Sequence, residues 1–120
     1  MVTWAMAEAT YPDWETLNAR HIAARRAQAV KAAQAAAAAA AKLGVRVIVF
    51  GSLATGRFHR SSDLDLALEG PEDMLNRANG AAFSAAAAEG FEPDIVWLSH
   101  AAPGLAARIR ETGRDPAGLG

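Results

Sequence analysis

The sequence has no cysteine, few aromatic residues and no surplus of charge of either sign. Without cysteine there are no disulfides, no thiolate metal sites and no cysteine nucleophile. Twelve Lys and Arg residues stand against thirteen Asp and Glu residues, so the chain lacks the basic excess that phosphate contacts need. Nucleic acid is therefore not expected as a partner. The three histidines are scattered without metal-ligand spacing, so zinc is not expected either.

Long hydrophobic runs are missing as well. The run of alanines Ala35–Ala41 is too short and too weakly hydrophobic to cross a bilayer, and no membrane association is expected. The first ten residues include Glu8 and lack a basic region followed by an apolar one, so no signal peptide is expected. A cysteine-free chain without such a leader is expected in the cytoplasm.

What is present is the composition of a small globular protein. The chain has 120 residues, of which 52% are hydrophobic and 21% charged, and this length suits one compact domain. We expect an N-terminal extension over residues 1–12, one domain over 13–113 and a loose C-terminal tail over 114–120. Trp4 and Trp14 are expected either to pack on a sheet or to fill an interface with a partner.

The pattern of apolar residues and breakers predicts the order helix, strand, strand, helix, strand, helix. The expected elements are a long helix over 13–43, strands over 45–50, 63–69 and 94–98, and helices over 71–90 and 102–112. Ser99 is expected to cap the last helix, and Gly80 to weaken or split the helix over 71–90. Three short strands need helices packed on one face, which leaves the other face to present side chains to a ligand.

Three acids lie on predicted strands, where acids are normally depleted. Asp63 and Asp65 are two residues apart, so their carboxylates point to the same side of the sheet. Their mutual repulsion becomes attraction when a divalent cation binds between them, and oxygen ligands suit Mg²⁺ or Mn²⁺. Asp94 completes the set if its strand lies beside that of Asp65. Taken alone, Ser61-Ser62-Asp63 is more typical of a turn that opens a strand, with Asp65 facing solvent; the metal-site interpretation depends on Gly51, Ser52 and Asp94 as well.

Gly51 and Ser52 follow the first predicted strand directly. A glycine lets the backbone approach a ligand closely, and backbone N–H groups with a serine hydroxyl at the start of a helix suit phosphate. A phosphate site and metal-binding acids within one short stretch indicate a shared nucleoside triphosphate.

The stretch from Gly51 to Leu66 resembles the signature of the DNA polymerase beta-like nucleotidyltransferase superfamily, which is Gly-Ser, about ten residues, then Asp-x-Asp. Ten residues separate Ser52 from Asp63. The resemblance covers Val45 to about Gly113 and is strongest to the small, stand-alone minimal nucleotidyltransferases. It implies an α+β nucleotidyltransferase fold: a small mixed three-stranded sheet with helices packed on one face, preceded here by a long N-terminal helix.

The resemblance also implies roles for residues. Asp63, Asp65 and Asp94 would hold Mg²⁺ or Mn²⁺, with Asp94 helping to activate the attacking hydroxyl, and Gly51 and Ser52 would bind the β- and γ-phosphates of ATP or another nucleoside triphosphate. The expected reaction is attack on the α-phosphate with release of pyrophosphate, assisted by two metal ions.

Minimal members of the family often read Gly-Ser-Arg-Ala-Arg-Gly, whereas Leu53 and Thr55 replace the two arginines here. Arg57 or Arg60 is expected to supply the missing charge at the nucleotide. Glu92 is a rival to Asp94 as third acid.

Small members of the family often transfer AMP to a partner protein, as antitoxins beside a helical toxin with HEPN-type nuclease activity. The resemblance therefore implies a metal-dependent nucleotidyltransferase whose hydroxyl acceptor belongs to such a partner protein. If the chain has no such partner, it is expected to associate with copies of itself as a homo-oligomer. The alternative is a weak or inactive transferase-like module that acts by binding a partner.

Overall fold

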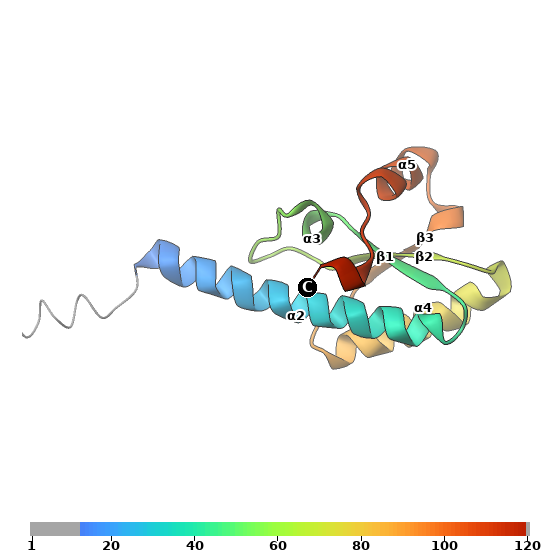
Figure 1. Cartoon of the computed structure of the whole chain (residues 1–120), viewed down its shortest axis with the longest axis horizontal. Coiled ribbons are helices and arrows are strands. Elements are labelled where there is room, and N and C mark those ends of the chain that lie inside the picture. Colours follow the sequence, from blue (N-terminus) through green and yellow to red (C-terminus); the bar gives the residue numbers. More distant parts are fainter. Residues whose placement is uncertain (1–12, 120) are drawn as a thin grey trace, which may run out of the picture.

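The computed structural model describes residues 13–119, and Trp4 and the expected extension over residues 1–12 lie outside them. The described chain is α+β, with a three-stranded sheet between two helical layers (Figure 1). Its strands are β1 (Arg46–Phe50), β2 (Asp65–Glu69) and β3 (Asp94–Trp97), and its helices are α2 (Trp14–Ala41), α3 (Ser52–Thr55), α4 (Leu75–Ala88) and α5 (Pro103–Thr112). The expected α+β class, the mixed three-stranded sheet and the long N-terminal helix are confirmed, and the order of elements holds apart from the additional short helix α3. The expectation that helices pack on one face only is wrong, because α5 packs on the second face.

The sheet is mixed, with strand order β1-β2-β3. β1 pairs with β2 antiparallel, and β2 pairs with β3 parallel. Because parallel neighbours need a crossover connection, the chain runs from β2 through the turn Glu72–Met74 and α4 before it returns as β3. Alternate residues of β2 therefore face opposite layers: Leu66 and Leu68 join the main core, whereas Ala67 faces α5.

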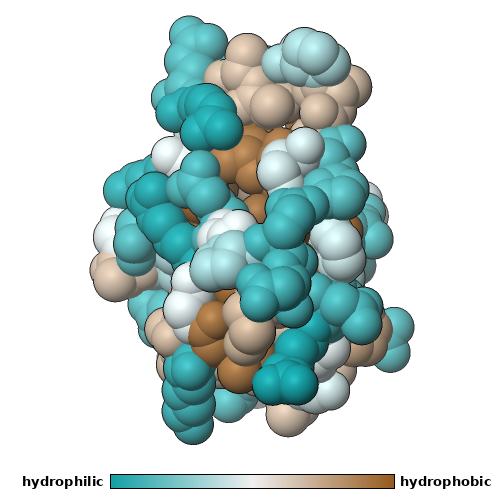
Figure 2. Space-filling model, turned by 90° about the vertical axis from the view of Figure 1, so that its right-hand side faces the viewer, coloured by the Kyte–Doolittle hydropathy of each residue, from teal (hydrophilic) through white to brown (hydrophobic). Residues whose placement is uncertain are grey.

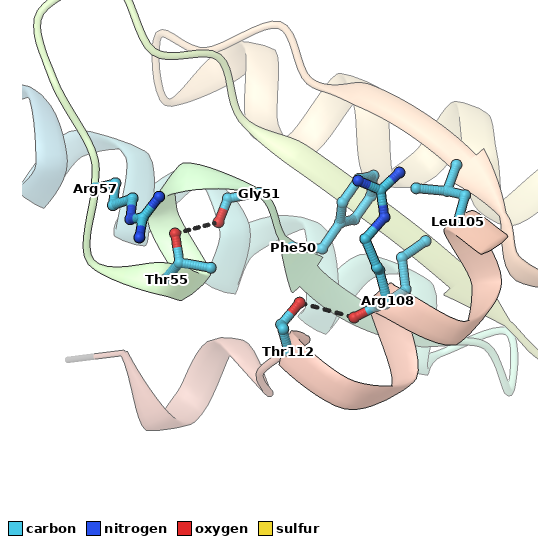
Figure 3. A pocket seen from close by; sticks show the side chains of 8 residues that line it. Phe50, Gly51, Thr55, Arg57, Leu105, Arg108 and Thr112 are labelled. Atoms are coloured by element: carbon cyan, nitrogen blue, oxygen red, sulfur yellow. Dashed lines mark hydrogen bonds between the residues drawn. The ribbon is translucent and has the colours of Figure 1, made fainter.

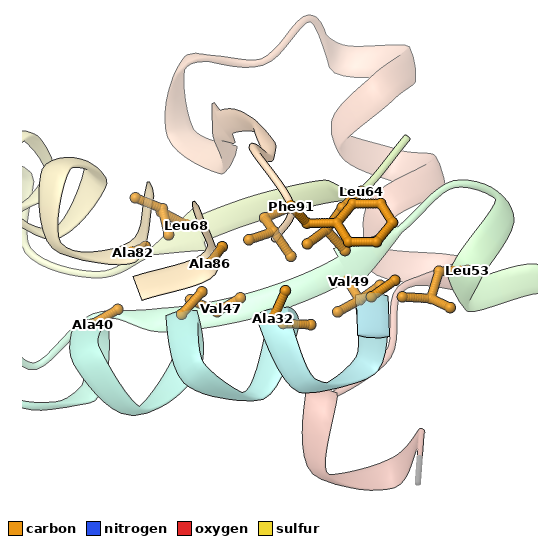
Figure 4. Close-up of a cluster of buried hydrophobic side chains, with 14 of the residues drawn as sticks. Ala32, Ala40, Val47, Val49, Leu53, Leu64, Leu68, Ala82, Ala86 and Phe91 are labelled. Atoms are coloured by element: carbon orange, nitrogen blue, oxygen red, sulfur yellow. The ribbon is translucent and has the colours of Figure 1, made fainter. Parts of the chain in front are cut away.

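The main core lies between the sheet and the helices α2 and α4 (Figure 4). The sequence of α2 does not reveal its packed face, because alanine fills both sides. In the structure Ala29, Ala32, Ala33, Ala36 and Ala40 are fully buried. This spacing of three and four residues forms one stripe along the helix, and small side chains let α2 pack closely against its neighbours.

The first half of α2 projects beyond the body of the protein (Figure 1). Asp13 begins the helix by accepting a hydrogen bond of 2.7 Å from the Thr16 backbone N–H. Trp14 is 69% exposed, so within the described residues it does not pack on the sheet. The opposite end of the molecule is mostly hydrophilic with small hydrophobic patches (Figure 2). Within residues 13–119 no helix has the length and hydrophobicity that a bilayer span requires.

The second face of the sheet carries α5, which covers part of it. Ile109 of α5 is buried against Ile48, Ala67 and Leu98. The rest of this face remains open for side chains at the ends of β1, β2 and β3. The expectation that Ser99 caps α5 is wrong: Ala102 precedes the helix, and the Ser99 hydroxyl instead donates a 2.8 Å hydrogen bond to Glu72.

The C-terminal tail is packed, contrary to the expectation that it is loose. Arg114 forms a two-way backbone bridge with Val49 at the free edge of β1. Pro116 and Leu119 are buried, and the Gln34 side chain donates to the Pro116 carbonyl at 3.2 Å. Edge strands expose unpaired backbone groups, and the bridge at Val49 satisfies one such pair.

Gly80 does not split its helix, since α4 continues through it from Leu75 to Ala88. A Cβ added at Gly80 would meet nothing within 4 Å. Replacing Gly80 with alanine should therefore stabilise the protein by about 0.5–1 kcal/mol, because alanine has less backbone freedom to lose on folding. Thermal unfolding of Gly80→Ala should show a midpoint about 2–5 °C higher; a lower midpoint would contradict the continuous helix.

Candidate active site

The end of β1 turns sharply at Gly51, which precedes the short helix α3. Gly51 has φ 72° and ψ −151°, a conformation that is essentially restricted to glycine. A Cβ at this position would overlap Oδ2 of Asp65 and come within 3.3 Å of its Cγ. Gly51 therefore allows the chain to turn and also leaves room for the Asp65 carboxylate beside it.

Two acids face each other across neighbouring strands. Asp65 is the first residue of β2 and Asp94 the first of β3, and the parallel register makes them direct partners. Direct partners in a sheet carry their side chains on the same face, which here is the face of α5. Asp63 lies two residues before Asp65 along the chain and is exposed. The structure thus brings together the three predicted acids at one edge of the second face.

The electrostatics of Asp65 reflect this grouping. Burial raises the pKa of the Asp65 carboxyl above its usual value, and the negative charges of Asp94 and Asp63 raise the pKa further. Within residues 13–119, however, no three acidic, histidine or cysteine side chains already surround a point that could hold an ion. Like charges repel, which opposes a closer approach of these carboxylates in the absence of a cation.

A cavity of about 530 Å³ lies beside the acids, between α3 and α5 (Figure 3). Gly51 lines the cavity and also lies directly beside the Asp65 carboxylate. The cavity and the acidic group are therefore adjacent. The volume is within the range of small-molecule sites. The lining combines apolar and cationic residues and contains no carboxylate; its members are Phe50, Gly51, Thr55, Arg57, Leu105, Arg108, Ile109 and Thr112.

The two candidate arginines of the loop after α3 lie in different places. Arg57 lines the cavity beside Gly51. Arg60 lines a separate hollow of about 190 Å³ against Trp14 and His21 of α2. The structure thus favours Arg57 over Arg60 as the cation near a bound phosphate. Ser52, the first residue of α3, is half-buried at the same corner as Gly51.

Sequence reasoning missed the contribution of α5. Leu105, Arg108 and Thr112 complete the far wall of the cavity. They are about one helical turn apart and share one side of α5, but only the packing of α5 on the sheet brings them near Gly51. No local motif signals that packing.

A sequence model of the nucleotidyltransferase domain matches residues 33–110. This chain belongs to the nucleotidyltransferase domain family. The match spans the last third of α2, the whole sheet and most of α5. No curated protein and no solved structure matches the chain.

Family membership gives the chain a nucleoside triphosphate as substrate and the transfer of a nucleoside monophosphate as its general reaction. Nucleotidyltransferases generally use divalent metal ions, so the question is whether the three acids provide ligands that such an ion prefers. The donor set of Asp63, Asp65 and Asp94 is oxygen only, which suits Mg²⁺. The raised pKa of Asp65 shows that its neighbours' charges already act on it. In donor chemistry these residues fit the metal, although the three carboxylates do not surround a common point among residues 13–119.

The register also bears on the choice of third acid in this nucleotidyltransferase. Asp94 pairs directly with Asp65, whereas Glu92 precedes β3 and is separated from the pairing by the buried Pro93. The negative charges that raise the pKa of Asp65 come from Asp94 and Asp63. The geometry favours Asp94 over Glu92.

The two positions that depart from the arginine-rich motif have different environments. Leu53 is 1% exposed and belongs to the main core. Thr55 lines the cavity, but its hydroxyl donates to the Gly51 carbonyl at 3.2 Å. Neither residue offers positive charge to a nucleotide, so in this nucleotidyltransferase that charge has to come from outside the segment 51–56.

Proposed function

We propose that this chain is a metal-dependent nucleotidyltransferase that transfers AMP from ATP to a hydroxyl group on a partner protein. The observation that carries the proposal is the pairing of Asp65 with Asp94 beside Gly51. The pairing supports the proposal because these carboxylates could hold a divalent metal next to a cavity with cationic walls, and a nucleoside triphosphate needs both. Asp63 and Asp94 are exposed, so an acceptor hydroxyl on another protein can reach them from outside the domain.

Asp63, Asp65 and Asp94 would hold the metal ions, for which Mg²⁺ or Mn²⁺ is proposed. When bound, the ions supply positive charge to the α-phosphate and the leaving oxygens. Gly51 would leave the backbone accessible to the phosphates, and Arg57 on the cavity wall and Ser52 at the start of α3 would donate hydrogen bonds to them. Asp94 accepts the proton of the acceptor hydroxyl.

The transfer step is an in-line substitution at the α-phosphorus. The acceptor oxygen forms a bond to this phosphorus as its proton passes to the Asp94 carboxylate. The bond between the α-phosphorus and the oxygen that bridges to the β-phosphate breaks, and pyrophosphate leaves with the electron pair. The partner is then left with AMP on its hydroxyl oxygen.

Transfer can be tested with labelled nucleotides. Incubation with Mg²⁺, the product of the neighbouring gene and ATP labelled at the α-phosphate should label that product, whereas ATP labelled at the γ-phosphate should not. Asp63→Asn should remove the label, because it removes a metal ligand. Competition with unlabelled GTP, CTP and UTP tests the preference for adenine. Equal labelling by wild type and Asp63→Asn would rule the proposal out.

A second candidate is a module that neutralises a partner, such as a helical HEPN-type toxin, by contact alone. The observation that favours it is the loss of both motif arginines, with Leu53 turned into the core. Calorimetry separates the two candidates: binding of the partner without any binding of Mg-ATP favours the module, whereas binding of Mg-ATP favours the enzyme.

A further inference from the structure

Helix α5 is fixed on the sheet in one rotational setting. Ile109 is 1% exposed and packs on Ile48 and Ala67. With Ile109 directed at the sheet, the adjoining side of α5 carries Arg108 and Thr112 over the cavity. A side chain on a packed helix is positioned more exactly than one on a loop. The position of Arg108 is therefore more precisely set than that of Arg57, which lies on the loop after α3.

The guanidinium group of Arg108 is available to a ligand. Within residues 13–119 it forms no ion pair, whereas Arg110 on the same helix pairs with Glu69 at 3.2 Å. The Thr112 hydroxyl is occupied, because it donates to the Arg108 backbone carbonyl at 2.7 Å (Figure 3). Arg57 faces the same cavity from the side of α3 and also lacks an ion pair among the described residues.

The cavity therefore has two unpaired guanidinium groups on opposite walls and no carboxylate in its lining. Such a site attracts anions, and arginine binds phosphate with two parallel hydrogen bonds. The neighbouring segment 51–56 has no cation of its own, since Leu53 and Thr55 stand at the motif's arginine positions.

From this geometry we infer that Arg108 of α5 binds the β- and γ-phosphates of the donor nucleotide, together with Arg57. The inference rests on the proposed function and extends it: the positive charge that the segment 51–56 lacks is supplied by a helix that follows the third strand. Arg108 is thus a substrate-binding residue that selects triphosphates over mono- and diphosphates. Arg57, on the opposite wall of the cavity, binds the same phosphates from the other side.

The test measures nucleotide affinity by calorimetry with Mg²⁺ and three ligands: ATP, ADP and AMP. Wild type should bind ATP most tightly and AMP most weakly. Arg108→Gln should weaken ATP binding about tenfold, or about 1.4 kcal/mol, and should leave AMP binding within about twofold. The ATP affinity of Arg108→Lys should lie between those of wild type and Arg108→Gln, because lysine keeps the charge but loses the planar guanidinium group.

Arg110→Gln is the matched control, since it removes the same charge from the same helix at a position outside the cavity. It should bind all three nucleotides within about twofold of wild type. Unchanged ATP binding by Arg108→Gln would overturn the inference alone. An equal loss for ATP and AMP would also overturn it, because Arg108 would then contact a part that both nucleotides share. Failure of wild type to bind any nucleotide would overturn the proposed function as well.

Discussion

Replacing Asp65 with asparagine should abolish nucleotide transfer while making the metal-free protein more stable. Asp65 is central to the acid group, because it pairs with Asp94 and lies beside Gly51. Loss of a metal ligand removes several kcal/mol of transition-state stabilisation, so transfer should fall by about three orders of magnitude. The rate of pyrophosphate release in the presence of acceptor measures this effect.

The gain in stability follows from the raised pKa of Asp65. Burial and the charges of Asp94 and Asp63 raise the pKa above its usual 3.8, so the folded chain holds a proton more tightly than the unfolded chain. The contribution of Asp65 to stability is therefore full below pH 3.8 and is lost as pH rises through the raised value in the folded state. At pH 7, Asp65→Asn should gain up to about 1 kcal/mol, the scale of partly exposed charge interactions.

This gain should shrink as pH falls and should disappear below pH 3.8, where Asp65 becomes protonated in both states. Glu69→Gln is the control, since Glu69 lies on the same strand and pairs with Arg46 and Arg110. It should lose a few tenths of a kcal/mol and keep its transfer rate. A metal-free Asp65→Asn protein that is less stable than wild type at pH 7 would show that Asp65 is not under strain from its neighbours.

Replacing Gly51 with alanine should damage both the fold and the site. The backbone conformation of Gly51 costs an alanine about 1–3 kcal/mol, and the new Cβ would also overlap the Asp65 carboxylate. Urea denaturation should show a loss of at least about 2 kcal/mol from these two effects. At temperatures where the variant is still folded, transfer should be about a hundredfold slower, because Asp65 must move away from the metal site.

Gly56→Ala separates these effects. Gly56 ends α3 with φ 79° and ψ 14°, and a Cβ there meets nothing within 4 Å. This change should cost only about 1 kcal/mol, the usual penalty of a left-handed residue, and transfer should stay close to wild type. If Gly56→Ala slowed transfer as much as Gly51→Ala, the contact between Gly51 and Asp65 would not explain the loss.

Local patterns were sufficient to predict the three strands and to place Asp65 and Asp94 on them, but the expectation that Asp63 lies on a strand is wrong, because β2 begins at Asp65. In the segment 63–69 leucines alternate with acids and alanine. Because successive side chains of a strand point to opposite faces, this alternation predicts that the leucines face the core and that Asp65 faces the other side. The spacing of Gly51-Ser52 from Asp63 identifies the family, which the match over residues 33–110 confirms. The pairing of β3 beside β2 needed the resemblance, because strand order leaves no local trace in a sequence.

Features set by contacts between distant segments could not be predicted. The packed tail depends on Val49 and on Gln34 of α2, neither of which is near it in the sequence. The face of α2 that packs is hidden by alanine on all sides. Arg57 and Arg60 look equivalent in the sequence, but a difference of three residues places them in different hollows.

The central claim is that Asp63, Asp65 and Asp94 bind divalent metal together with a nucleoside triphosphate. Its most direct test is calorimetric titration of a non-reactive ATP analogue, with and without Mn²⁺, into wild type, Asp94→Asn and Glu92→Gln. Wild type and Glu92→Gln should bind the analogue at least about tenfold more tightly with Mn²⁺, and Asp94→Asn should lose that gain. Equal binding with and without Mn²⁺ in wild type, or a loss in Glu92→Gln alone, would contradict the account.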